Sequence, residues 1–128
     1  MNRKVPAILA VCIALALAVA GAALSRSSST PTLKGVVGPG FTISLKKGTA
    51  KVKTLKTGKY RFVISDKSTI HNYTIEREKP SSPKIEKHAT SSPFTGSKTF
   101  VMTLKPGSWR AYCSVHEAQM HIDFKVTR

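Results

Sequence analysis

From Phe41 onward, apolar and polar residues alternate with a period of two, with one long interruption. The apolar positions fall into six groups: Phe41, Ile43 and Leu45; Tyr60, Phe62 and Ile64; Tyr73 and Ile75; Phe100, Met102 and Leu104; Trp109, Ala111 and Cys113; and Ile122, Phe124 and Val126. Because successive side chains of a β-strand point to opposite faces of the sheet, each group predicts a strand with one buried face. Short strands separated by Gly and Pro turns predict an all-β fold, and specifically a Greek-key β-sandwich.

The interruption runs from Arg77 to Gly96 and contains three prolines among several Ser and Lys residues. Polar, proline-rich connections of this kind run over the protein surface. We therefore predict a long, mobile surface loop that connects the two halves of the sandwich. His88 lies inside this segment, and we expect its side chain to be exposed to solvent rather than to bind a ligand.

The N-terminal segment has the pattern of a targeting sequence. Arg3 and Lys4 precede an almost entirely apolar run at residues 5–24, and residues 18–20 offer a cleavage site of small residues. This pattern predicts an exported protein that is periplasmic, extracellular or tethered to the outer face of the cytoplasmic membrane. About 20 apolar residues also suffice to span a bilayer, so residues 1–24 are either a signal peptide or an N-terminal membrane anchor helix.

The rest of the chain divides into a linker and one domain. Residues 25–33 are rich in Ser, Thr and Pro and show no apolar period, which predicts a flexible linker. Residues 34–128 are few enough that they can bury only one core, so we predict a single domain over this range.

The chain is strongly basic. Without Arg3 and Lys4 it keeps 19 of its 21 basic residues against 6 acidic ones, a net charge of +13. In an exported protein this charge favours anionic cell-surface polymers, anionic lipid headgroups or an acidic partner protein over nucleic acid. The alternative is that lysines such as Lys46, Lys51 and Lys59 only keep a small sandwich soluble. The sequence leaves both interpretations open.

One short segment carries most of the candidate chemistry. The sequence CSVHEAQM places the thiol of Cys113, the imidazole of His116 and the thioether of Met120 in one loop between two predicted strands. These soft ligands favour copper over magnesium or calcium, and two His, one Cys and a weak axial Met form the ligand set of blue-copper electron-transfer sites. His71, at the start of another predicted strand, is the best candidate for the second His.

These segments resemble the small cupredoxins of the plastocyanin and amicyanin type over nearly the whole mature domain. The resemblance rests on GPGFTISL, on GKYRFVISDKSTIHNY and on KPGSWRAYCSVHEAQMHIDFKV. It implies one copper ion, held by the strong ligands His71, Cys113 and His116 and by the weak axial ligand Met120. It also implies that Asn72 ties the His71 segment to the loop near Ser114, with its backbone N–H directed at the Cys113 sulfur.

Two positions depart from the pattern of the family. Val115 stands where many members have Pro, and His121 follows Met120 where Gly is common nearby. We expect the side chain of His121 to point outward, because Ile122 takes the core face and strand side chains alternate.

The resemblance implies an exported one-electron carrier with an acidic redox partner, and we expect a monomer that binds no nucleic acid. We predict no enzymatic activity, since Cys113 and His116 both lie in the metal loop and no separate group orients a nucleophile. Two alternatives remain open. The first is a copper carrier or buffer that hands its metal to another protein, and the second is a metal-free sandwich that binds cell surfaces through its basic face.

Overall fold

The computed structural model describes residues 27–128, which form ten β-strands. The strands are β1 (Thr32–Val37), β2 (Ile43–Lys47), β3 (Ala50–Lys51), β4 (Thr54–Lys56), β5 (Gly58–Asp66), β6 (Tyr73–Lys79), β7 (Glu86–Thr90), β8 (Gly96–Leu104), β9 (Gly107–Tyr112) and β10 (His121–Thr127). Among these residues no helix has the length and apolar content that a membrane span requires. The predicted signal peptide or anchor lies outside the described residues.

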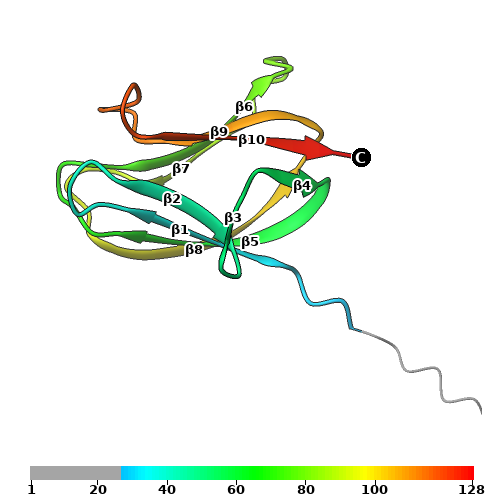
Figure 1. Ribbon diagram of the computed structural model, residues 1–128, viewed down its shortest axis with the longest axis horizontal. Helices are drawn as coiled ribbons and strands as arrows, with labels where there is room; N and C mark the ends of the chain where they lie inside the picture. Colours follow the sequence, from blue (N-terminus) through cyan, green and yellow to red (C-terminus); the bar gives the residue numbers. More distant parts are fainter. Residues whose placement is uncertain (1–26) are drawn as a thin grey trace, which may run out of the picture.

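The strands form two five-stranded sheets that face each other (Figure 1). The first sheet has the order β3-β2-β1-β5-β8, and the second sheet has the order β4-β10-β9-β6-β7. β1 pairs in parallel with β5, and β10 pairs in parallel with β4, whereas the other neighbours are antiparallel. Each sheet takes strands from both halves of the chain, which confirms the predicted all-β Greek-key sandwich.

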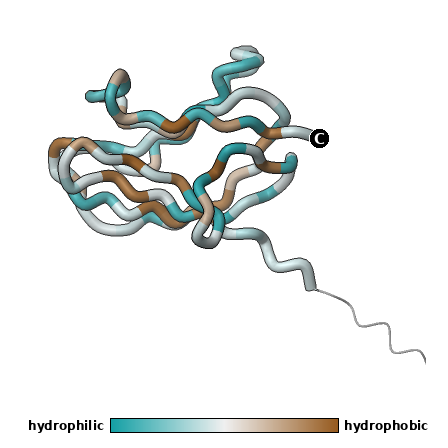
Figure 2. Tube along the Cα trace, in the orientation of Figure 1, coloured by the Kyte–Doolittle hydropathy of each residue, from teal (hydrophilic) through white to brown (hydrophobic). Residues whose placement is uncertain are grey.

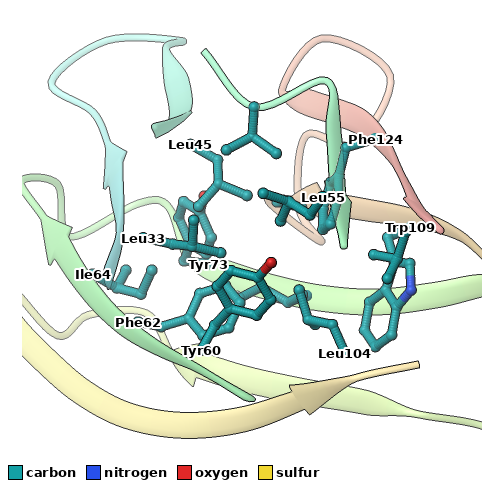
Figure 3. Packing of buried hydrophobic residues seen from close by; sticks show 14 of the residues in the cluster. Leu33, Leu45, Leu55, Tyr60, Phe62, Ile64, Tyr73, Leu104, Trp109 and Phe124 are labelled. Carbon is teal, nitrogen blue, oxygen red and sulfur yellow. The ribbon is translucent and has the colours of Figure 1, made fainter. Parts of the chain in front are cut away.

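Side chains from both sheets fill the space between them (Figure 3). Leu33 and Phe62 of the first sheet and Tyr73 and Trp109 of the second are completely buried. Apolar and polar residues alternate along the strands (Figure 2), as the sequence pattern requires. Burial of an apolar side chain such as Leu33 or Phe62 contributes about 1.5–3 kcal/mol relative to exposure. The described core lies between Leu33 and Val126, so residues 27–128 contain a hydrophobic core of their own, as an independently folding domain requires.

Tyr73 links the two sheets across this core. A Cβ atom on Gly35 of β1 would lie 2.8 Å from the Tyr73 ring and hydroxyl, so only glycine permits this close approach. The Tyr73 hydroxyl donates a hydrogen bond to the carbonyl of Ser44 at 2.9 Å. These contacts fix the start of β6, and therefore the neighbouring His71, against the first sheet.

Three details differ from the sequence prediction. The flexible linker predicted over residues 25–33 extends too far, because β1 begins at Thr32 and Leu33 is a core residue. The loop predicted from Arg77 to Gly96 contains the end of β6 and the edge strand β7, which pairs with β6. Phe41 was predicted as a buried strand residue, but it precedes β2 and is 57% exposed.

The strand ends that frame the candidate site meet at one end of the sandwich. Val37 at the end of β1 is level with Asp66 at the end of β5. In the second sheet, Tyr112 at the end of β9 pairs with His121 on one side and with Thr74 on the other. The chain enters β1 at the opposite end (Figure 1). The loops after these strand ends therefore gather at the end of the sandwich that is remote from the entry of the chain.

Candidate metal centre

Three predicted ligands, His71, Cys113 and His116, lie together at this end of the sandwich. His71 stands two residues before β6, Cys113 directly follows β9, and His116 lies in the loop that leads to β10. The two histidine Nδ1 atoms are 3.1 Å apart. The Cys113 sulfur is 3.9 Å from Nδ1 of His71 and 3.8 Å from Nδ1 of His116. The structure thus brings His71 together with Cys113 and His116, which lie 42 and 45 residues further along the chain.

The spacing of these atoms fits a single metal ion. With bonds of about 2.0 Å to nitrogen and about 2.3 Å to sulfur, as for zinc, two nitrogens on one ion lie at most about 4 Å apart. The corresponding limit for nitrogen and sulfur is about 4.3 Å. All three separations in the structure lie below these limits. A thiolate with two imidazoles is a donor set that copper favours, so the residues fit one copper ion.

The ligands differ in their exposure to solvent. His71 and Cys113 are completely buried, whereas His116 is partly exposed. Nδ1 is the nitrogen of each ring that faces the other two ligand atoms. Nε2 of His71 is buried and has no hydrogen-bond partner among the described residues. Among the described residues, the His71 ring therefore makes its polar contacts through Nδ1 alone, to His116 and Cys113.

The loop from Cys113 to Met120, which we call the ligand loop, is closed by backbone hydrogen bonds. The Cys113 N–H donates to the Met120 carbonyl at 3.0 Å, and the His116 N–H donates to the Cys113 carbonyl at 3.1 Å. The Met120 N–H donates to the His116 carbonyl at 2.8 Å. Met120 is completely buried and belongs to the core cluster. Its role as a weak axial ligand stays a prediction.

Asn72 connects the His71 segment to the ligand loop in the way that the resemblance implied. Its backbone N–H donates to the Cys113 sulfur at 3.4 Å. Its side-chain Nδ2 donates to Ser114 Oγ at 2.8 Å, and its Oδ1 accepts from the Ser114 N–H at 2.8 Å. A hydrogen bond to the sulfur stabilises negative charge on it, and outer bonds of this kind orient metal ligands.

Phe41 is the site residue that the sequence analysis missed. Its ring packs edge-on against His71 and His116, with centroid distances of 5.4 and 5.0 Å. Gly38 and Gly40 adopt positive φ values of 70° and 71°, so a turn carries Phe41 out of the sheet. The sequence Gly-Pro-Gly before Phe41 was the signal that could have indicated this loop.

Phe41 is one of three exposed apolar residues beside the ligands. Ile70 directly precedes His71 and is 57% exposed, and Val115 directly precedes His116 and is 60% exposed. Large hydrophobic side chains with this exposure are few among the described residues, and three of the four lie at this end. Such clustering is typical of surfaces that contact another molecule.

Arg110 holds the ligand loop to the second sheet from outside. Its guanidinium forms two hydrogen bonds with Asp123 of β10, at 2.7 and 3.2 Å, and one with Glu117 of the loop at 2.9 Å. Glu78 of β6 lies 3.3 Å away. The Arg110 guanidinium holds the pKa of the Asp123 carboxyl below its usual value. One side chain thus joins the loop, β9, β10 and β6.

Tyr112 directly precedes Cys113 in the chain, but its hydroxyl contacts the carboxylates of Glu76 and Glu86 instead of the ligand group. Its hydroxyl donates to Glu76 at 3.0 Å and contacts Glu86 at 3.3 Å. Burial, assisted by these carboxylates, raises the pKa of Tyr112 above its usual value. The side chain therefore connects the backbone next to Cys113 with the acidic surface of β6 and β7.

The two remaining histidines lie outside the ligand group. His88 of β7 is exposed, and its Nδ1 is 3.1 Å from Thr74 Oγ1. His121 is also exposed, and its Nδ1 is 2.8 Å from the Glu117 carbonyl oxygen. Both outward orientations agree with the sequence prediction.

The sequence matches no protein-family model and no curated protein. Solved structures nevertheless share the fold. Rusticyanin from Thiobacillus ferrooxidans has a TM-score of 0.50 and 20% identity, over 77% of this chain and 79% of that chain. A reduced rusticyanin structure gives a TM-score of 0.51 at 17% identity, over 75% and 76% of the two chains.

A multi-copper oxidase from Pediococcus acidilactici has a TM-score of 0.53 at 15% identity. The match covers 99% of this chain but only 30% of the oxidase. Together with the rusticyanin structures, it shows that the two-sheet sandwich has the cupredoxin fold. On that fold, the group of His71, Cys113 and His116 is consistent with a type 1 site for one copper ion.

Proposed function

We propose that this protein is an exported type 1 copper protein that carries one electron at a time between partners. The observation that carries the proposal is the convergence of His71, Cys113 and His116, whose ligand atoms all lie within 4.8 Å of one another. When bound there, copper supplies a centre that changes between two oxidation states. Met120, which closes the loop, is proposed as the weak axial ligand.

The surroundings of the ligands support electron transfer because they restrict movement. Electron transfer is fast when the ligands keep nearly the same positions in both oxidation states. Asn72 fixes two ligand segments to each other, and Arg110 fixes the loop to three strands. Tyr73 anchors the segment after His71 to the opposite sheet. These contacts hold the ligand atoms at set positions on a rigid sandwich.

A route for the electron also leads from the ligands to the surface. His116 is partly exposed and lies between the buried sulfur and solvent, and the exposed ring of Phe41 packs against it. With Ile70 and Val115, this ring forms an apolar contact area around the exposed ligand. We propose that a redox partner docks there, because apolar contacts exclude water along the short path to His116.

We propose that the chain alone catalyses no reaction. The likeness to an oxidase covers less than a third of that enzyme, and an oxidase of this class needs further clustered histidines. Within residues 27–128 the only group of metal-binding side chains that comes together is the single one around Cys113. One site of this kind suits a carrier that depends on other proteins for its electrons.

A carrier that delivers copper itself is the second candidate, because His116 is partly exposed and stands in a loop. Copper retention separates the two functions. The copper-loaded chain is cycled between ascorbate and ferricyanide in the presence of a chelator specific for Cu(I). An electron carrier keeps its copper and its colour through many cycles. Transfer of copper to the chelator within the first reduction would contradict the proposal and favour the copper carrier.

Export rests on the N-terminal sequence and is proposed together with the function. Fractionation of cells that express the tagged full chain tests it. Recovery outside the cytoplasmic membrane, or on its outer face, is the expected result. Recovery of the protein chiefly in the cytosol would contradict export.

A further inference from the structure

The acidic and basic residues are divided unequally between the two sheets. Of the six acidic residues, five lie in the second sheet or in the ligand loop: Glu76, Glu78, Glu86, Glu117 and Asp123. The sixth, Asp66 of the first sheet, is only 2% exposed and accepts hydrogen bonds from Thr90 and the Ser68 N–H. The first sheet therefore presents no exposed carboxylate to solvent.

The outer face of the first sheet instead carries a basic strip. We use this name for five exposed residues on four neighbouring strands: Lys34, Lys46, Lys51, Lys59 and Arg61. Lys34 of β1 lies directly opposite Lys46 of β2, and Lys46 lies directly opposite Lys51 of β3. Directly opposite residues share a face, with Cβ atoms about 4.5–5.5 Å apart. Three lysines thus form an unbroken row across three strands.

This row is expected to lower the stability of the sheet, because like charges directly opposite each other on paired strands are destabilising. None of the five residues forms an ion pair in the described part of the chain, where the ion pairs involve Lys84, Arg110 and two histidines. A solvated charge pattern that served only solubility would need no such alignment. An anionic ligand would remove the repulsion, which indicates that the row is a binding surface.

The position of the strip separates it from the metal centre. Arg61 lies five residues before Asp66, where β5 ends near the metal centre. Because a strand rises by about 3.3 Å per residue, Arg61 is roughly 16 Å from that end of the strand. Lys34, in contrast, is only two residues from Thr32, where the chain enters β1. The strip is therefore close to the start of β1, and the apolar contact area around His116 stays free.

An exposed apolar residue lies at the edge of the strip, beside Arg61. Val101 of β8 is 52% exposed and stands directly opposite Arg61 of β5. A soluble polyanion forms no apolar contact with a side chain such as Val101. The boundary between the headgroups and the acyl chains of a bilayer, in contrast, binds both charged and apolar side chains. The combination favours a membrane surface as the ligand.

We propose that the basic strip binds the anionic phospholipid headgroups of a bilayer. The domain then lies with its first sheet on the membrane. The end that carries His116 remains accessible to a partner. This inference goes beyond the proposed electron transfer and does not depend on bound copper.

Vesicle sedimentation of residues 27–128 tests the proposal, because the apolar run of the full chain would itself insert into lipid. The probes are vesicles of phosphatidylcholine alone and vesicles that also contain phosphatidylglycerol. The strip variant carries Lys34→Gln, Lys46→Gln and Lys51→Gln. The control variant carries Lys79→Gln, Lys105→Gln and Lys125→Gln, which are exposed positions outside the strip, so both variants have the same net charge.

Wild type and the control variant are expected to sediment with the anionic vesicles at low salt and not with the neutral ones. The strip variant is expected to bind on the order of 100-fold more weakly, since each lysine near an anionic surface contributes about a fivefold effect. Thermal unfolding verifies that the strip variant is folded, and removal of like charges should leave it at least as stable as wild type. Equal weakening in both variants would overturn the proposal, because net charge alone would then explain binding. Wild-type binding to soluble dextran sulfate without binding to anionic vesicles would overturn it in favour of a polyanionic polymer.

Discussion

Asn72 and Ser114 exchange two hydrogen bonds of 2.8 Å between the segment that carries His71 and the loop that carries Cys113 and His116. The same Asn72 residue directs its backbone N–H at the Cys113 sulfur. One residue therefore sets both the relative position of two ligand segments and the polar environment of the sulfur. Changes at this pair test whether the ligands are held in place by their surroundings.

Asn72→Ala is expected to lower the free energy of unfolding by about 1–2 kcal/mol, because two well-formed hydrogen bonds are lost. Looser ligand segments should also release copper faster and broaden the visible absorption of the copper form. Chemical denaturation and a chelator competition assay measure the two effects. Ser114→Ala is the matched control, since it removes the bond to Oγ but keeps the backbone bond. An Asn72→Ala variant with wild-type stability and copper release would show that this pair does not hold the site.

Met120→Leu is expected to leave a blue site with an altered and raised reduction potential, because a weak donor to Cu(II) is lost. Met and Leu side chains have similar volumes, so the substitution at this buried position should lower the free energy of unfolding by less than about 1.5 kcal/mol. Redox titration of the copper-loaded protein gives the potential. Unchanged potential in Met120→Leu, together with a shift in His121→Ala or Glu117→Ala, would show that another residue in the loop is the axial ligand.

The parts of this structure that the sequence predicted are the parts that depend on local patterns. Period-two alternation predicted the buried faces of β5 and β9, and the sequence analysis expected His71, Cys113 and His116 to come together. The contacts of Asn72 were implied by the resemblance to the small cupredoxins. In these segments the local sequence pattern is enough to predict which residues are buried and which lie at the metal centre.

Other features depend on turns and on pairing between distant strands. The exposed position of Phe41 follows from the turn at Gly38 and Gly40, which a pattern of alternate residues does not contain. β7 was predicted as loop because an edge strand with exposed Lys and His side chains has no apolar face of its own. The basic strip appears only when β1, β2 and β3 are in register, so the lysines looked scattered along the sequence.

Arg110→Gln is expected to loosen the ligand loop, because Glu117 and Asp123 lose their shared partner. The pairs are largely exposed, so the loss in the free energy of unfolding should be about 0.2–1 kcal/mol at neutral pH. The pKa of Asp123 is lowered in the folded protein, so the pair stabilises the fold above the unfolded pKa of about 3.9 and is lost as pH falls through the lower folded value. The difference between variant and wild type should therefore vanish in strong acid.

Denaturation at several pH values measures this difference, and Asp123→Asn is the matched control. It removes the titrating partner but keeps Arg110 with Glu117. A pH-independent difference for Arg110→Gln would contradict the assignment to the ion pairs.

Electron exchange with an acidic redox partner is expected to slow as salt increases. Without Arg3 and Lys4 the chain has a net charge of +13, which attracts such a partner over a distance, and salt at physiological ionic strength screens this attraction beyond about 8 Å. Stopped-flow measurements over a range of salt concentrations give the dependence. Rates that do not change with salt for any acidic partner would contradict a role of the net charge in association.

The visible spectrum recorded on addition of Cu(II) to residues 27–128 tests the central claim most directly. A short bond between copper and the Cys113 thiolate gives an intense blue band, so the account predicts this band at one copper per chain. Cys113→Ser should abolish the band, whereas His121→Ala, a neighbouring histidine outside the ligand group, should keep it. Uptake of copper without the band, or an equal band in Cys113→Ser, would contradict a type 1 copper site in this protein.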